Sequence, residues 1–455
     1  MASLNFNIGD NVGRVHKSPA KYSQGDKVRL RLALDELDGK VLESPDSEIV
    51  LIKLDSGYNI GIKKENILAS RVLKKFNLVE EEKFLPKKNN DLPSIGLVIS
   101  GGTIASKLDA KTGGVKPLTS LNEFAKFYPE VFESVNVKKI ISSFMISSES
   151  MSSEHWIGIA KAVKELVDDN EIHGVVVTHG TDTLSYTASA LSFFLRNLNK
   201  PVVLTYSQRS IDRASSDAHL NLECAVRFSL SDFAGVVLVG HGSVNDDFCF
   251  ALSGTKVRKM HSSRRDAFQP INSKPVAKVF SDSPENRKFS DPTTLGRVEG
   301  VEFFGKHKLR SKENCELDVS YSDKVALVKI YPGQDPSILD FYALKYRGIV
   351  LEGTGLGHVP SSDSLQNWIP ALKKHIRNGL VVCMTTQCLN GKVDGFVYGN
   401  GRELIDAGVI FLEDILPETA LVKLGFVLGH YGWKNKVKEK MLENFSGEIG
   451  ERLVV

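Results

Sequence analysis

The stretch Gly174-Val-Val-Val-Thr-His-Gly-Thr-Asp-Thr183 decides the expected fold. Its three consecutive valines are apolar and β-branched, and the run is too short for a helix, so it predicts a buried strand. A helix pattern begins directly afterwards, with Asp182 or Thr183 as the expected N-cap. Thr181 and Asp182 therefore lie at the carboxyl end of a parallel strand and at a helix N-terminus. Open α/β sheets bind ligands at such positions, and the helix end favours a carboxylate or a developing oxyanion.

A second strand end of the same kind occurs earlier in the chain. The predicted strand at 95–99 runs into Ser100-Gly-Gly-Thr-Ile-Ala-Ser106, so Thr103 also follows a strand. Neighbouring crossovers can bring Thr103 and Thr181 to one cleft. A threonine hydroxyl is a poor nucleophile unless a base removes its proton. Lys259, in the segment 253–268, is the candidate base, because a lysine paired with the carboxylate of Asp182 can relay a proton.

Each of these features, taken alone, has a simpler explanation. Gly101-Gly-Thr103 is also typical of phosphate-binding loops and tight turns, Thr181-Asp182 of helix caps, and Lys259 of solvated basic runs. The segment 353–357, with glycine at alternate positions, is a poor dinucleotide-binding signal, because no acidic residue follows a second strand at the required distance. Only the combination of the features favours a catalytic site.

Hydrophobic periodicity divides the chain into an N-terminal module and two α/β domains. Several short strands, with turn signals such as Asp38-Gly39, predict a small β-barrel over 1–75 that serves for docking or spacing. A charged linker follows at 76–92. Alternating strands and helices predict an α/β domain at 93–285 and another, with a tail, at 324–455, joined by a linker or excursion at 286–323. The expected fold class is α/β, with two doubly wound parallel sheets.

Composition limits the classes of function. The 455 residues are 42% hydrophobic and 25% charged with a formal net charge of +3, as in globular proteins that neither require nor exclude a nucleic acid. No apolar run approaches the roughly 20 residues of a membrane span, and the N-terminus does not resemble a signal peptide. The five cysteines are scattered through apolar segments, which favours reduced thiols in a cytoplasmic protein. Their spacing matches no common metal site.

The combined motifs closely resemble the bacterial-type L-asparaginases. The matching segments, in the family's order, are Gly101-Gly-Thr-Ile-Ala105, Ser148-Glu-Ser-Met151, Thr178-His-Gly-Thr-Asp-Thr183, Gln208-Arg-Ser to Asp217, Lys259-Met-His to Phe268, and Thr386-Gln-Cys to Val393. The resemblance spans roughly residues 93 to 440 and implies an asparaginase-like fold over both α/β domains. It also implies that no metal and no organic cofactor is bound by this chain.

The resemblance implies a role for each matching residue. Thr103 would attack a side-chain carboxamide, and Thr181, Asp182 and Lys259 would form a second triad that activates a nucleophile or a water. Which threonine attacks first stays open. Ser148 and Asp182 would bind the α-carboxylate and α-amine of the substrate. The remaining expected substrate-binding residues are Glu149, Gly102 and Gly180.

Two departures from free asparaginases point to a narrower family. The loop tyrosine usual in free asparaginases is absent, because the corresponding segment reads Gly114-Val-Lys-Pro117 and Val115 takes its place. The N-terminal module, with Lys53-Leu-Asp-Ser-Gly-Tyr-Asn-Ile-Gly61, is similar to that of the D-type subunits of archaeal glutamyl-tRNA(Gln) amidotransferases. In that family the asparaginase-like D-type subunit releases ammonia from glutamine, and its partner, the E-type subunit, uses the ammonia.

The narrower resemblance implies partners as well as a reaction. The E-type subunit would use ATP and Mg²⁺ to amidate glutamyl-tRNA(Gln) and would make most of the tRNA contacts, in a heterotetramer containing a homodimer of this chain. The enzyme would be a ligase-class amidotransferase with its amidohydrolase half-reaction on this chain. A stand-alone cytoplasmic L-asparaginase or glutaminase is the main alternative, and it leaves the N-terminal module without a role. A non-catalytic scaffold or tRNA-binding protein is disfavoured, because all four catalytic residue types are present.

Overall fold

The structure is a computed structural model. The residues that it describes are 22–42, 44, 46–54, 59–75, 92–108, 115–118, 126–129, 134–142, 144–211, 213, 215–281 and 298–451. Almost all of the predicted linker 76–92 therefore lies outside the described residues, as do Gly114 and the side chain of Val115. The chain divides into two compact units, and each is described by itself.

The N-terminal unit contains a five-stranded antiparallel sheet. Its strands, in spatial order, are β4 (Asn59–Lys63), β3 (Ile49–Leu54), β2 (Glu36–Leu42), β1 (Lys27–Arg31) and β5 (Ala69–Lys74). Val28, Leu30 and Ile52 are buried on one face. In the pairings between described residues, β4 and β5 stand at the two ends of this order, in the part of the chain predicted as a small β-barrel.

The turn predicted at Asp38-Gly39 is wrong, because both residues lie inside β2. Gly39 is required there for a different reason. A Cβ atom at this position would lie 2.7 Å from the carbonyl oxygen of Lys53 on the neighbouring strand. Close backbone approach within a sheet and turn formation select the same residue type, so the sequence alone does not separate them.

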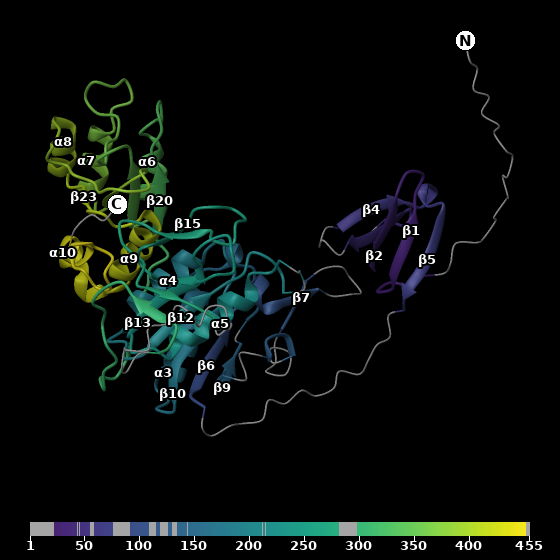
Figure 1. The fold of residues 1–455 in the computed structure, drawn as a ribbon. Coiled ribbons are helices and arrows are strands. Elements are labelled where there is room, and N and C mark those ends of the chain that lie inside the picture. The colour runs from purple at the N-terminus through teal and green to yellow at the C-terminus, as the bar shows by residue number, and fades with distance from the viewer. Residues whose placement is uncertain are drawn as a thin grey trace, which may run out of the picture. The chain divides into compact units, whose positions relative to one another are not determined.

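The larger unit is built on an eight-stranded mixed sheet (Figure 1). Five neighbouring strands are parallel: β9 (Asn136–Ile141), β6 (Ser94–Ile99), β10 (Ile172–Thr178), β12 (Pro201–Thr205) and β13 (Gly235–His241). Three antiparallel strands extend the edge beyond β13: β14 (Cys249–Ser253), β17 (Ala277–Val279) and β18 (Val301–Phe303). The carboxyl ends of the five parallel strands therefore meet at one edge, as the sequence predicted for Thr103 and Thr181.

Helices cover both faces of this sheet, because the parallel strands carry apolar side chains on both faces. Val175 and Val177 of β10 join one hydrophobic cluster with α3 (Ser153–Val167) and α4 (Leu184–Phe194). Val176 of the same strand belongs to the opposite cluster with α5 (Ala218–Ser229). The three-valine run was thus correctly predicted as a fully buried strand.

The C-terminal part forms a second, four-stranded parallel sheet. Its strands, in order, are β20 (Val325–Lys329), β21 (Gly348–Gly353), β22 (Val381–Thr386) and β23 (Ile410–Phe411). The helices of this part are α6 (Ile338–Lys345), α7 (Ile369–Arg377), α8 (Gly399–Ala407), α9 (Pro417–Gly429) and α10 (Val437–Leu442). Residues of α6, α7 and α8 share one hydrophobic cluster, and those of α9 and α10 share another. The predicted fold class, α/β with two sheets, is therefore confirmed, although three antiparallel strands extend the first sheet.

Short elements complete the described chain. Two-stranded pairings join β7 (Ser106–Leu108) to β8 (Val115–Pro117), β11 (Leu195–Arg196) to β19 (Glu316–Leu317), and β15 (Val257–Lys259) to β16 (Phe268–Pro270). The 3₁₀ turns are η1 (Lys64–Asn66), η2 (Thr103–Ala105), η3 (Ser148–Ser150) and η5 (Tyr431–Lys436). Strands β18 and β19 fall within the segment predicted as a linker or excursion. No helix among the described residues is long and apolar enough to cross a membrane.

A buried ion pair stabilises the C-terminal part. Lys423 of α9 and Glu448 are both fully buried, and Lys423 Nζ lies 2.7 Å from Glu448 Oε1. The backbone amides of Phe445 and Ser446 also donate to the Glu448 carboxylate, at 3.0 and 2.7 Å. The tail after α9 is thus held to this helix by charge as well as by apolar packing.

Substituting Lys423→Met should destabilise the protein by about 3–5 kcal/mol, because the Glu448 carboxylate then stays buried without its cation. Lys374→Met is the matched control, since Lys374 is 61% exposed in its pair with Asp340, and exposed pairs contribute about 1 kcal/mol or less. Urea unfolding midpoints measure both variants. Equal midpoints for the two would contradict a stabilising role of the buried pair.

Candidate active site

Backbone pairing continues beyond the ends of β6 and β10. The carbonyl oxygen of Thr178 accepts hydrogen bonds from the amide and the hydroxyl of Ser100, at 3.2 and 2.8 Å. Ser100 is buried, so both bonds are shielded from water. The two loops that follow these strands therefore start from a fixed separation.

The loop after β6 then passes directly over the loop after β10. Gly102 has a φ of 84°, and a Cβ atom on it would lie 2.5 Å from the amide nitrogen of Gly180 and the carbonyl oxygen of His179. Only glycine satisfies both constraints. Thr103 directly follows Gly102 and begins η2, and Thr181 directly follows Gly180. The two predicted nucleophiles thus emerge side by side at the sheet edge.

Ser148 connects a third loop to the same place. Its Oγ accepts the amide hydrogen of Asp182 at 3.1 Å, and its carbonyl oxygen accepts the hydroxyl of Thr183 at 2.6 Å. Thr183 occupies the N-cap position of α4, but its side chain makes no cap hydrogen bond, because the hydroxyl is directed to Ser148. Glu149, the neighbouring residue in η3, is exposed. The loop after β9 is therefore joined to the start of α4.

Lys259 completes a hydrogen-bonded triad with Thr181 and Asp182. Its Nζ donates to Thr181 Oγ1 at 2.8 Å and to Asp182 Oδ1 at 2.7 Å, while Thr181 Oγ1 donates to Asp182 Oδ1 at 3.3 Å. The lysine side chain is 16% exposed, whereas that of Asp182 is 59% exposed. The hydrogen bond from Lys259 lowers the pKa of Asp182, so this carboxylate is ionised at neutral pH. The arrangement differs from the solvated basic run that was the alternative for Lys259.

Thr103 is positioned apart from the triad's hydrogen bonds. Within the described residues, its hydroxyl forms no hydrogen bond with Thr181, Asp182 or Lys259. Its place is set by the backbone: Ser106 Oγ donates to the carbonyl oxygen of Gly102 at 2.8 Å, and the amide of Ala105 donates to the same atom at 3.1 Å. The structure thus brings all the predicted catalytic residues to one edge but joins only three of them through side chains.

The hairpin that carries Lys259 is anchored to the C-terminal part. Lys256 Nζ donates to Asp414 Oδ2 at 2.7 Å and to the Asp414 carbonyl oxygen at 3.0 Å, and both side chains are buried. Arg258 forms a second ion pair, at 3.1 Å, with Glu418 of α9. The position of Lys259 therefore depends on residues of the second domain.

Two further residues shape the site, and sequence reasoning did not single them out. His179 is buried, and its ring nitrogens contact the Gly180 carbonyl oxygen at 2.6 Å and Thr187 Oγ1 at 2.8 Å. Burial lowers the pKa of His179 to about 4, so the ring is neutral and holds the Gly180 peptide. Tyr128 is also buried and donates its hydroxyl to the Ile104 carbonyl oxygen at 2.7 Å, directly behind Thr103. His179 lay inside a recognised motif, whereas nothing in the sequence marked Tyr128.

The described residues contain no group of three or more His, Cys, Asp or Glu side chains arranged to hold a metal ion. What the site offers instead is two hydroxyl groups, an amine that can exchange a proton, a carboxylate and a helix N-terminus. These are the components of nucleophilic acyl transfer.

Family models match three parts of the chain. Residues 94–290 match the model described as "Asparaginase, N-terminal", residues 324–441 match "Glutaminase/Asparaginase C-terminal domain", and residues 22–73 match "GatD N-terminal domain". Among solved structures, a thermostable L-asparaginase from Thermococcus kodakarensis has a TM-score of 0.68 and 32% identity, covering 79% of this chain and 100% of its own. An L-asparaginase I from Vibrio cholerae has a TM-score of 0.62 and 26% identity, covering 79% of this chain and 99% of its own.

Curated relatives match nearly the whole chain. The D-type subunit of the glutamyl-tRNA(Gln) amidotransferase of Pyrococcus furiosus is 47% identical over 438 residues, which cover 94% of this chain and 93% of that protein. The D-type subunits of Methanococcus maripaludis and Methanosarcina acetivorans are each 41% identical, over 94% and 95% of this chain and 98% and 99% of their own. The resemblance to these enzyme subunits, predicted from the motifs, is confirmed. The chain belongs to the GatD family, the D-type subunits of glutamyl-tRNA(Gln) amidotransferases.

Proposed function

We propose that this chain is the glutaminase subunit of a tRNA-dependent amidotransferase. It hydrolyses glutamine to glutamate and ammonia, and the E-type subunit uses the ammonia with ATP to convert glutamyl-tRNA(Gln) to glutaminyl-tRNA(Gln). The observation that carries the hydrolytic half is the contact of Lys259 with both Thr181 and Asp182 at the edge that also presents Thr103. The full-length match to GatD proteins supports the amidotransferase half.

The chemistry proceeds through an ester on threonine. A threonine oxygen bonds to the amide carbon of glutamine, the tetrahedral intermediate collapses with protonation of the nitrogen, and ammonia leaves. Water then attacks the ester, which releases glutamate and restores the hydroxyl. Each step requires a group that accepts a proton from an oxygen and returns one.

Lys259 is the proton-transfer group in this proposal. A charged ammonium can only donate hydrogen bonds, so Lys259 must be neutral to accept the Thr181 proton. Asp182 stays ionised beside it, which stabilises the ammonium formed when the proton arrives. Because the pKa of Asp182 is lowered, its carboxylate stays ionised from neutral pH to below the ordinary Asp value and is protonated only as pH falls further.

The substrate's polar ends are held by the loops around the triad. Ser148 Oγ accepts the Asp182 amide hydrogen, so its own hydroxyl proton can be donated to the α-carboxylate of glutamine. The exposed carboxylate of Asp182 binds the α-amine, and Glu149, Gly102 and Gly180 line the same edge. Backbone amides near Thr181 stabilise the oxyanion, where the N-terminus of α4 also favours negative charge.

Thr103→Ala and Thr181→Ala should each lower glutamine-driven amidation about a thousandfold or more, while ammonia-driven amidation by the complex with the E-type subunit stays unchanged. Thr354→Ala is the matched control, because Thr354 is exposed on the loop after β21. Loss of ammonia-driven amidation as well would show that a variant damages the assembly, and the role of that threonine would lose its support.

Lys259→Arg should lower glutamine hydrolysis about a hundredfold or more, and Lys259→Ala should do the same. Arginine keeps the charge beside Asp182 but does not release its proton in proteins. Steady-state ammonia release measures both variants. Near-normal activity of Lys259→Arg would mean that the lysine acts only through its charge.

The chain alone should release ammonia slowly, and addition of the E-type subunit with glutamyl-tRNA(Gln) should accelerate the release. The N-terminal unit and the absence of the loop tyrosine at Val115 motivate this expectation, since a glutaminase active without its partner wastes glutamine. Ammonia release from glutamine and asparagine is measured with and without the E-type subunit. Rapid asparagine hydrolysis by the lone chain would favour a stand-alone asparaginase instead.

A further inference from the structure

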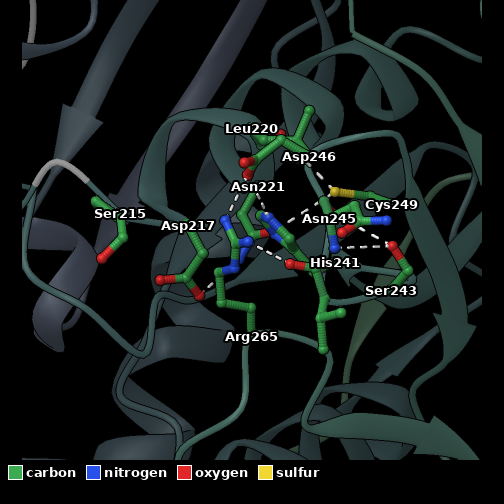
Figure 2. Close-up of polar contacts among 12 residues, drawn as sticks. Ser215, Asp217, Leu220, Asn221, His241, Ser243, Asn245, Asp246, Cys249 and Arg265 are labelled. Carbon is green, nitrogen blue, oxygen red and sulfur yellow. Dashed lines mark hydrogen bonds and ion pairs between the residues drawn. The ribbon is translucent and has the colours of Figure 1, made fainter.

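A second polar cluster lies at the same edge of the sheet, at the ends of β12 and β13 (Figure 2). His241, the last residue of β13, is 2% exposed. Figure 2 shows its ring between Asn221 of α5 and Asp246 of the loop after β13: Nδ1 lies 2.6 Å from Asn221 Oδ1, and Nε2 lies 3.0 Å from Asp246 Oδ1. The proposed chemistry uses none of these residues.

On the helix side, the orientation of Asn221 is fixed. Its Nδ2 donates to the Tyr206 carbonyl oxygen at 2.9 Å and faces Asp217 Oδ2 at 3.4 Å. Asp217, fully buried at the N-cap of α5, also accepts the amides of Gln208 and Arg209, at 2.9 and 3.0 Å. Since Nδ2 has these acceptors, Asn221 presents Oδ1 to His241, and Nδ1 of the histidine must be a donor.

On the loop side, Asp246 is held as an acceptor. Arg265 Nη1 donates to Asp246 Oδ1 at 2.7 Å, and the same guanidinium donates to the Val244 carbonyl oxygen. Burial raises the pKa of Asp246, but His241 and Arg265 outweigh burial and lower it overall. An ionised Asp246 offers no hydrogen, so Nε2 of His241 also faces an acceptor.

His241 therefore satisfies both contacts only as an imidazolium. Burial and Arg265 lower the pKa of His241, while Asp246 and Asp217 act to raise it, and the net shift is downward. The remaining titratable neighbour, Cys249, reaches the cluster through Asn221 Oδ1, at 3.4 Å. Above its folded pKa the ring has a single proton for two acceptors, so one of the two contacts weakens.

The loop side of the cluster leads to Lys259. Arg265 lies in the loop 260–267 that joins β15 to β16, and its carbonyl oxygen accepts the Tyr206 hydroxyl at 2.9 Å. Within that loop, the Met260 amide donates to the Ala267 carbonyl oxygen at 2.6 Å, immediately after Lys259. Contacts that hold Arg265 thus also hold the end of this loop, which pairs with Met260, the residue after Lys259.

The helix side of the cluster leads toward Thr103. His219, in the first turn of α5, stacks on the ring of Tyr128 with a centroid separation of 6.3 Å. Tyr128 in turn holds the Ile104 carbonyl oxygen. The two ends of the cluster therefore reach the backbone behind Thr103 and the loop behind Lys259.

We propose that His241 is a positioning residue for amide hydrolysis. Through Asp246 and Arg265 it holds the loop behind Lys259, and through Asn221 and Asp217 it ties that loop to α5. The inference rests on the proposed role of Lys259, and it adds that the lysine is held in place by hydrogen bonds outside the triad.

The test uses the complex with the E-type subunit and glutamyl-tRNA(Gln), with His241→Gln, Asp246→Asn and the double variant. Each single substitution should lower kcat for glutamine hydrolysis about tenfold, with KM within about twofold, because the substrate-binding loops are untouched. The double variant should lose no more than the more impaired single variant, since both residues act through one chain of contacts. Ammonia-driven amidation should stay unchanged in all three.

His375→Gln is the matched control and should leave kcat unchanged. His375 is likewise a buried histidine bonded to an aspartate, with Nε2 2.8 Å from Asp340 Oδ1, but it lies on α7 in the C-terminal part. If His241→Gln fails to melt cooperatively, Asp246→Asn and Arg265→Lys carry the same expectation, because they alter the loop end of the chain of contacts and leave the buried histidine in place.

Two results would overturn the inference. One is a kcat of His241→Gln within about twofold of the parent, and the other is a double variant whose loss equals the product of the two single losses. Lys259→Ala, assayed in parallel, shows whether only the role of His241 is wrong or the proposed function as well. Full hydrolysis by Lys259→Ala would remove the triad assignment itself, whatever the result for His241.

Discussion

The contact between the backbones of Gly102 and Gly180 is the constraint on which the candidate site depends. It brings the loops after β6 and β10 closer than any side chain would allow, and a threonine follows each glycine. Two hydrogen bonds maintain the contact. The Ser100 hydroxyl donates to the Thr178 carbonyl oxygen, and the His179 ring is bonded to the Gly180 carbonyl oxygen. The two predicted nucleophiles are therefore positioned by main chain, which has less freedom than side chains.

Lys259 reaches this place by another route. It lies on a two-stranded hairpin outside the main sheet, so the sheet alone does not position it. Lys256 at the base of the hairpin is bonded to Asp414, Arg258 to Glu418, and the loop beyond Lys259 to the His241 cluster. The triad is thus the meeting point of a rigid sheet edge and a hairpin held from both of its ends.

Much of the fold could be predicted from the sequence, because strand and helix patterns in the α/β domains are strong. The valine run of β10 and the Gly-Gly-Thr segment after β6 also located the candidate site, since strand ends of a parallel sheet meet at one edge. What could not be predicted depends on long-range contacts. Gly39 signals a turn and a close strand approach equally well, and the segment 286–323 contains edge strands too short to show a pattern. Tyr128 contacts Ile104, 24 residues away, and His241 contacts Asn221, 20 residues away, so no local pattern marks these contacts.

The anchoring of Lys256 to Asp414 has a consequence for how the protein is made. Both threonines and Lys259 leave the ribosome before Asp414 and Glu418, which lie much later in the chain. A nascent chain can thus form the sheet and bring Thr103 and Thr181 together before the hairpin has its partners. Until the second domain has been synthesised, the hairpin of Lys259 lacks its anchors Asp414 and Glu418, so a truncated chain contains both threonines and the lysine without the contacts that hold the lysine beside them.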